Sequence, residues 1–535
     1  MTPPATLDDA TQEIPAKTRP KVGFVSLGCP KNLVDSEVMM GLLHHNGAEL
    51  TPRAEDAEII VINTCSFIDS AKQESVNTIL EMVQHKQQNG GKAQRIVVAG
   101  CLVERYRDEI QKNIPEVDAV VGTGELEAIL AAAGLTSSGH ANNSPFNILT
   151  QSQISRAPSA VHQHSHPTEI SQQLTIEAAT RSDSLDAKSR PEGNAREQSG
   201  RFSRAAWDGA TAALPEYLYN DETPRILTTP RASAYIKIAE GCDHPCSFCI
   251  IPQLRGKFRS RRMSSIIAEA ENLIAQGVRE ITLIGQDTTC YGEDLGLTEG
   301  LSELLAALAV LPGLRWLRFL YTYPNKVTTR LLETMAKHDT IAKYLDVPLQ
   351  HASASVLKTM KRGGNAQIFL DLIAKARRIV PGIVIRTSFI VGFPGETEAD
   401  YKELEAFITA AKIDWLGVFT YSDEEGAAAF NLDEALKIPK RTIESRRRKL
   451  MKLQQKISTK SKAAWVDREV DLLVEGESEE TELLWQGRTP LHAPEIDGKV
   501  LINDFGPHET LVPGTFYRAL ITESHDYDVV ARILE

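Results

Sequence analysis

Three cysteines stand within eight residues in the stretch EGCDHPCSFCIIP, at Cys242, Cys246 and Cys249. A structural zinc site normally has four Cys or His ligands, often as two close-spaced pairs, and a second pair is missing here. His244 is the nearby candidate for a fourth zinc ligand, but it lies inside the tight cysteine loop. The spacing favours an iron–sulfur cluster with three thiolate ligands and one open iron, with a closed zinc site as the alternative.

Three further cysteines each follow a short apolar run typical of a strand. Cys29 ends KVGFVSLGC, Cys65 ends AEIIVINTC and Cys101 ends RIVVAGC, with 36 residues in each step. Helical patterns follow all three, so the region is predicted to form a doubly wound parallel sheet. Since the carboxyl ends of parallel strands share one edge, we expect the three cysteines to meet there. The alternative is that they are buried and pack as small hydrophobic side chains.

Length and composition set the limits for the whole chain. With 535 residues we expect three or four domains at about 150 residues each, and a net charge of −12 argues against a protein that is basic throughout and held on nucleic acid. The seven cysteines do not resemble the framework of a small secreted domain, and the first twenty residues lack an apolar signal core. No apolar run approaches the roughly 18 residues of a membrane span. We therefore expect a soluble, cytoplasmic protein with no membrane partner.

Composition divides the chain into five parts. Residues 1–20 are expected to be flexible and 21–135 to form the sheet domain; 136–224 are polar and aperiodic, which indicates a disordered linker or insertion. Within that linker the stretch HQHSH is better explained as a solvated loop than as a metal site. In 225–462 six strand-like runs alternate with helical segments, which predicts a partial β/α barrel with functional residues at the carboxyl ends of its strands.

The last two segments carry opposite charge. The helical stretch from Lys437 to Lys462 holds eleven Lys or Arg and one Glu, and it can either contact RNA or face solvent. Residues 463–535 consist of short alternating runs between Gly, Pro and Asp turns, which predicts a small β-barrel. From Val466 onward this part has sixteen acidic and five basic residues, a formal charge of −11.

The C-x3-C-x2-C loop after the first barrel strand resembles that of the radical S-adenosylmethionine (SAM) enzymes, and Phe248 occupies the aromatic position before the last cysteine. This resemblance implies that three thiolates hold a 4Fe–4S cluster whose open iron binds SAM. Apart from the linker, the whole chain resembles the methylthiotransferases, with an N-terminal three-cysteine domain, a radical SAM core and a C-terminal TRAM barrel. In that family Cys29, Cys65 and Cys101 would hold a second 4Fe–4S cluster, and two SAM molecules would be consumed per turnover.

Four stretches are similar to the RimO branch of that family: VSLGCPKNLVDSE, AEGCDHPCSFCIIPQLRGKFRSR, VPLQH and IVGFPGET. This similarity implies methylthiolation of the β-carbon of an aspartate in small-subunit ribosomal protein S twelve. It also implies an electron donor, such as flavodoxin or ferredoxin, and a sulfur donor. The nearest alternative is the sister branch that acts on tRNA adenosine, and the acidic barrel makes tRNA the less favoured substrate. From another class, a non-catalytic iron–sulfur redox protein is the third possibility.

Other candidate residues follow from strand ends and local charge. Gly285, Gln286 and Asp287 end the second barrel strand, and Gly392, Gly395 and Glu396 lie in GFPGET after the fifth. All six are expected near SAM, although GFPGET is nearly as well explained as a plain turn. Cys290 is interpreted as a non-ligand thiol, and no catalytic residue is assigned beyond the clusters. An arginine group after the cysteine loop is expected to offset cluster charge, receive an acidic substrate or face solvent: Arg255, Arg259, Arg261 and Arg262.

Overall fold

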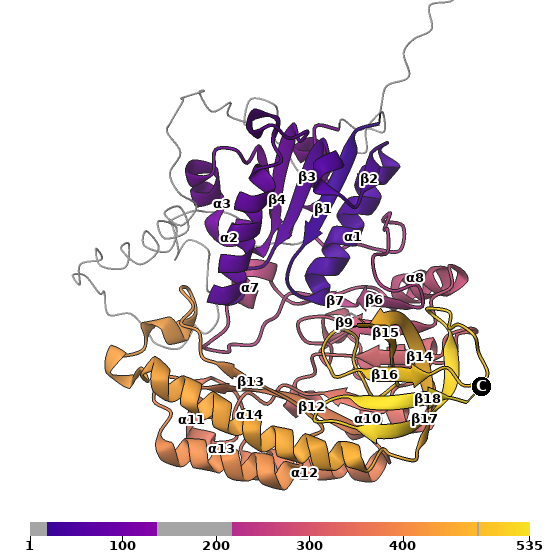
Figure 1. Ribbon diagram of the computed structural model, residues 1–535. Helices are drawn as coiled ribbons and strands as arrows, with labels where there is room; N and C mark the ends of the chain where they lie inside the picture. The colour runs from indigo at the N-terminus through magenta and orange to yellow at the C-terminus, as the bar shows by residue number, and fades with distance from the viewer. Residues whose placement is uncertain (1–18, 136–216, 479–480, 535) are drawn as a thin grey trace, which may run out of the picture.

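The computed structural model describes residues 19–135, 217–478 and 481–534. Figure 1 shows three parts: an N-terminal α/β domain, a central α/β core and a C-terminal barrel beside the core. Most of the predicted linker, including HQHSH, lies outside the described residues. Its last residues, from 217 onward, lie against the core, where buried Tyr219 is within 3.3 Å of the Glu269 carboxylate. No helix in the described part of the chain is long and apolar enough to cross a membrane.

The N-terminal domain is built on a five-stranded parallel sheet in the order β2-β1-β3-β4-β5. Its inner strands are rich in β-branched residues, and every residue of the third strand is buried, as expected for a sheet covered on both faces. The strands are β1 (Lys21–Ser26), β2 (Glu49–Thr51), β3 (Ile59–Thr64), β4 (Arg95–Gly100) and β5 (Ala119–Val121). The helices are α1 (Pro30–His45), α2 (Asp69–Val83), α3 (Cys101–Asn113) and α4 (Ile129–Ala132). The doubly wound fold is confirmed.

The core contains the six expected parallel strands, arranged as two three-stranded sheets in the orders β10-β9-β6 and β11-β12-β13. These strands are β6 (Ser233–Lys237), β9 (Glu280–Ile284), β10 (Trp316–Phe319), β11 (Tyr344–Asp346), β12 (Val384–Val391) and β13 (Trp415–Thr420). A short hairpin of β7 (Ala239–Glu240) and β8 (Arg259–Ser260) flanks the cysteine loop. The helices are α7 (Ile251–Arg255), α8 (Met263–Ala275), α9 (Gly300–Leu308), α10 (Thr329–Lys337), α11 (Ala354–Thr359), α12 (Ala366–Ile379) and α13 (Glu398–Ala411). The partial barrel is thereby confirmed.

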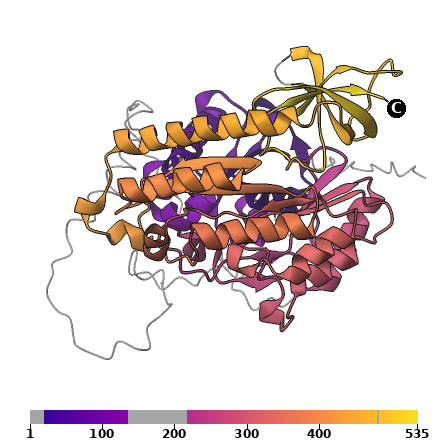
Figure 2. The same ribbon diagram turned by 90° about the horizontal axis from the view of Figure 1, so that it is seen from below.

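The long helix α14 (Lys440–Ala463) connects the core to the C-terminal barrel and lies on the outside of the molecule (Figure 2). The barrel is closed, in the order β14-β15-β16-β18-β17. Its strands are β14 (Glu469–Ser478), β15 (Thr481–Arg488), β16 (Val500–Asp504), β17 (Phe516–Ser524) and β18 (Val529–Ile533). Buried Arg488 of the barrel binds buried Glu280 of the core at 2.8 Å, which fixes the barrel on the core.

Candidate functional site: two cysteine triplets at one interface

The N-terminal triplet, defined as Cys29, Cys65 and Cys101, lies where the sequence placed it. Cys29 precedes the first turn of α1, Cys65 follows β3 directly and Cys101 begins α3 after β4. Strands β1, β3 and β4 are parallel neighbours, so their carboxyl ends bring the three thiols to one edge. The pKa of Cys101 is raised to about 12, mainly by burial and also by the nearby Cys65 and Cys29. The three side chains therefore form one group.

Gly28 allows the first loop of this triplet to approach the second. Its φ of +91° lies in the left-handed region that favours glycine, and a Cβ at this position would lie 2.8 Å from Cβ of Cys65. Any larger residue would push the two cysteine-bearing loops apart.

Asn32 connects all three cysteine-bearing loops, and sequence reasoning missed it. The side chain is 1% exposed, and its Nδ2 donates to the carbonyl of Leu27 at 2.9 Å and of Thr64 at 2.8 Å. Its Oδ1 lies 3.8 Å from Sγ of Cys101. The signal in the sequence was a polar residue three positions after Cys29, within the predicted helix. The structure adds that the first turns of this helix hold other buried polar side chains.

The loop triplet, defined as Cys242, Cys246 and Cys249, occupies the loop between β7 and α7. The backbone N–H of Cys242 donates to the carbonyl of Gly256 at 3.2 Å, which folds the loop back on itself. Gly241 makes this closure possible: its φ is +81°, and a Cβ would lie 2.1 Å from the Lys257 carbonyl oxygen. Burial and the neighbouring thiols raise the pKa of Cys242 and of Cys249 to about 12. Because the thiolate is the form that binds a metal, binding of an iron–sulfur cluster here would release these protons.

His244 is engaged elsewhere and does not complete a tetrahedron with the loop triplet. Its Nε2 lies 2.5 Å from Oδ2 of Asp287, and its ring stacks on Tyr323 with centroids 3.9 Å apart. Burial would raise the pKa of Asp287, but hydrogen bonds from His244, Thr289 and Cys290 lower it below its usual value. The closed zinc alternative therefore has no support in this arrangement. The Cys290 thiol, which belongs to neither triplet, donates to Asp287 at 3.1 Å.

The residues expected near SAM lie at the carboxyl ends of their strands, but several of their polar groups already have partners in the protein. Gln286, next to Gly285 after β9, donates through Nε2 to Glu240 at 2.5 Å, while its Oε1 is buried and has no partner among the described residues. Phe248 packs against an apolar cluster that includes Phe393. The unpartnered amide oxygen beside the loop triplet is a site that a polar cofactor group can satisfy.

GFPGET is held together by its own glutamate. The backbone N–H of Gly392 donates to Oε2 of Glu396 at 2.6 Å, and Arg446 of α14 donates to Oε1 at 2.6 Å. The N–H of Gly395 donates to the carbonyl of Leu436 at 2.9 Å. Glu396 therefore shapes the turn and binds α14, and its contact with SAM stays a prediction.

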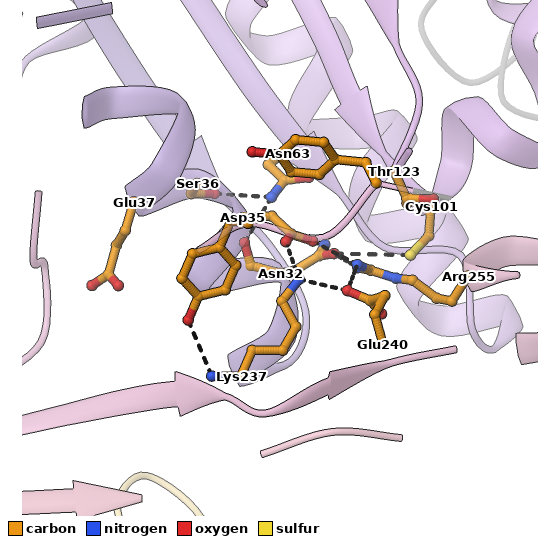
Figure 3. Close-up of polar contacts among 12 residues, drawn as sticks. Asn32, Asp35, Ser36, Glu37, Asn63, Cys101, Thr123, Lys237, Glu240 and Arg255 are labelled. Atoms are coloured by element: carbon orange, nitrogen blue, oxygen red, sulfur yellow. Dashed lines mark hydrogen bonds and ion pairs between the residues drawn. The ribbon is translucent and has the colours of Figure 1, made fainter. Parts of the chain in front are cut away.

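A buried ionic network crosses the domain interface, from the N-terminal triplet to residues on both sides of the loop that holds the other triplet (Figure 3). Arg255, 2% exposed at the end of α7, donates to Oδ2 of Asp35 at 2.6 Å and to Oδ1 of Asn32 at 2.5 Å. Lys237 of β6 also binds Asp35, and its Nζ lies 2.5 Å from Oε2 of Glu240. Two cations and two carboxylates thus balance, and Arg255 connects the loop of one triplet to the Asn32 that organises the other.

The arginine group after the cysteine loop is therefore divided. Arg255 and Arg261 are buried, and Arg261 binds Glu269 at 2.5 Å, so a solvated face is the wrong explanation for these two. Arg259 is half-buried and donates to the backbone carbonyl of Tyr217 at 2.8 Å. Arg262 is exposed just before α8.

Comparisons with known proteins agree with this architecture. Three family models match: "Uncharacterized protein family UPF0004" over residues 21–122, "Radical SAM superfamily" over 236–408 and "TRAM domain" over 466–534. Among solved structures, the radical SAM methyltransferase TsrM from Kitasatospora setae, with cobalamin and a [4Fe-4S] cluster bound, overlaps 75% of this chain and 72% of its own. Its TM-score is 0.44 and its identity 16%.

Two curated relatives carry the name ribosomal protein uS12 methylthiotransferase RimO. The protein from Koribacter versatilis is 64% identical over 525 residues, 98% of each chain. The protein from Solibacter usitatus is 52% identical over 96% of this chain and 95% of its own. Together with the radical SAM domain and its three-cysteine loop, these matches show a transferase that uses an iron–sulfur cluster and SAM. The chain belongs to the RimO family of radical SAM methylthiotransferases.

Proposed function

We propose that this chain adds a methylthio group to the β-carbon of an aspartate in small-subunit ribosomal protein uS12. The observation that carries the proposal is the 64% identity with a relative of that name over 98% of both chains. The geometry supports it, because six of the seven cysteines form two separate triplets on either side of one buried interface.

Each triplet would hold one 4Fe–4S cluster. When bound, the loop-triplet cluster and SAM would supply the radical that activates an unreactive C–H bond, and the N-terminal cluster would supply the sulfur site. The protein fixes the positions of the two cluster sites relative to each other. Asn32 fixes the three loops of the N-terminal triplet, and Arg255 ties that residue to the loop of the other.

The expected SAM residues divide into contacts and supports. Gln286 is proposed as a contact, because its buried Oε1 can accept a hydrogen bond from a bound cofactor. Asp287 and Glu396 are proposed as positioning residues, since their carboxylates already hold His244 and the GFPGET turn. Phe248, Gly285, Gly392 and Gly395 would then approach SAM through packing and backbone.

The charge of the C-terminal barrel favours a protein substrate over tRNA. The formal charge of −11 from Val466 onward would attract a basic ribosomal protein and repel RNA phosphates. Exposed acids, among them Glu477 on β14 and Glu509 before β17, contribute to this field. An electron donor such as flavodoxin or ferredoxin and a sulfur donor complete the proposed partners, and the substrate places the reaction in the cytoplasm.

The test is to incubate the reduced, reconstituted enzyme and SAM with three substrates: isolated uS12, assembled small subunits and tRNA. Mass spectrometry is expected to find a methylthio group on an aspartate of uS12, and 5′-deoxyadenosine is expected in the same reactions. Methylthiolation of tRNA alone would refute the proposed substrate, whereas absence of SAM cleavage would refute the assignment of the loop triplet.

A further inference from the structure

Helix α14 presents a line of basic side chains that the proposed reaction does not use. We define the basic ridge as seven exposed residues of α14 that form neither an ion pair nor a side-chain hydrogen bond with any described residue, which leaves out Arg447 because it donates to the Val418 carbonyl. The seven are Lys440, Arg441, Arg448, Lys449, Lys452, Lys456 and Lys460. At 100° per residue most of them point roughly opposite the buried face, which includes Ile443, Leu450 and Gln454. Glu444 is the single acidic residue of the helix.

The ridge extends from the mouth of the core to the C-terminal barrel. Near its start, Arg446 binds Glu396 of the GFPGET turn. Near its end, Thr459 donates to Oδ1 of Asp526 in the barrel at 2.7 Å. Figure 1 shows α14 along this path, and its 24 residues span about 36 Å. A macromolecule that reaches both the mouth and the barrel would pass beside these cations.

From this arrangement we propose that the basic ridge binds the phosphate backbone of RNA that surrounds the substrate protein. The inference deepens and rests on the proposed function, because it makes uS12 within an RNA-containing particle a substrate. A row of unpaired cations on one face of a long helix complements the regular charge of a nucleic acid backbone. The acidic barrel would then contact the protein of the particle, and the basic ridge would contact its RNA.

A membrane surface does not fit the same helix. Interfacial helices insert an exposed apolar face beside their basic residues, but here the apolar residues of α14, such as Ile443 and Leu450, are buried in the core cluster. No large apolar side chain of α14 is exposed. The ridge offers charge alone, which suits a solvated polyanion.

The test uses the full-length holoenzyme and two variants with the same change in net charge. The ridge variant is K449Q/K452Q/K456Q. The control is K112Q/K337Q/R378Q, three exposed helical cations distributed over α3, α10 and α12. Binding to purified small-subunit ribosomal RNA is measured between 50 and roughly 300 mM salt, with vesicles of anionic phospholipid and polyglutamate as alternative polyanions.

The native enzyme and the control are expected to bind the RNA with the same steep salt dependence. In the ridge variant the magnitude of the slope of log K against log salt concentration is expected to decrease by about 2–3. This value corresponds to three lost phosphate contacts at about 0.7–0.9 each. Its methylthio transfer to isolated uS12 should be unchanged, while transfer to uS12 in assembled subunits should fall at least several-fold.

An unchanged salt slope in the ridge variant, or an equal loss in the control, would overturn the proposal. So would binding to vesicles or polyglutamate that matches RNA binding and depends equally on the ridge. If no enzyme modifies uS12 in any form but the RNA slopes behave as expected, the proposed substrate fails and the RNA surface stands.

Discussion

Arg255 offers the most direct test of how the two triplets are held together. Replacing it with methionine keeps most of the side-chain volume but leaves Asp35 and Glu240 with Lys237 as their remaining cation. Asn32 also loses a charge-assisted hydrogen bond of 2.5 Å. Because all of these groups are buried, the change leaves one uncompensated negative charge at the domain interface.

Removing one partner of a buried ion pair typically costs about 3–5 kcal/mol. We expect R255M to lower the urea midpoint of the cluster-free protein by on the order of 1 M. Hydrogen exchange should accelerate in α1 and α7, on the two sides of the interface. The double variant R255M/D35N restores the charge balance, so its loss should be smaller than the sum of the two single losses.

The matched control is R378M, since Arg378 is an exposed arginine of α12. Its midpoint should lie within experimental error of the native value, because isolated surface substitutions rarely exceed about 0.5 kcal/mol. If R255M behaved like R378M, or if D35N added its full cost to R255M, the network would not be what holds the interface.

Three further outcomes follow from the same contacts. Alanine at all positions of the loop triplet should remove about half of the bound iron and abolish SAM cleavage, whereas alanine at the N-terminal triplet should preserve cleavage and stop methylthio transfer, as iron analysis and product assays would show. Burial would raise the pKa of Glu280, but Arg488 and Arg318 lower it to about 2, below the ordinary 4.5. Ionised Glu280 therefore contributes about 3 kcal/mol to the free energy of unfolding above pH 4.5, and this contribution is lost as the pH falls toward 2. The E280Q variant should show a weaker dependence of stability on pH in that range. Lysine at Glu477 and Glu509 should weaken uS12 binding measured at low salt, and unchanged affinity would contradict the electrostatic role of the barrel.

The cysteine positions were predictable because each depends on a local pattern. A β-branched run predicts a strand, and parallel topology places the following residues at one edge. The loop triplet could be predicted without any assumption about topology, since its three cysteines lie within eight residues. In both cases the sequence spacing and one topological rule determine which side chains meet.

The network between the triplets was not predictable by the same reasoning. Arg255 and Asn32 are 223 residues apart in the chain, and no periodicity relates two residues on different domains. The predicted SAM residues show a related limit: a strand-end carboxylate can contact a ligand or support the loop that does, and Asp287 and Glu396 have protein partners in this structure. The sequence pattern predicts which residues lie at the edge of the sheet, whereas the partner of each polar side chain there depends on tertiary packing.

The net charge of −12 hides two surfaces of opposite sign, and this limits what composition alone can say about partners. From Val466 onward the chain carries −11, while the basic ridge on α14 immediately before it presents seven exposed cations. A uniformly acidic protein would be repelled by any RNA-containing particle. With the charges separated along one side of the molecule, attraction to a basic protein and attraction to phosphate can act at the same time on different parts of one partner. Since salt screens both attractions, affinity for assembled subunits should decrease more steeply with salt than affinity for isolated uS12.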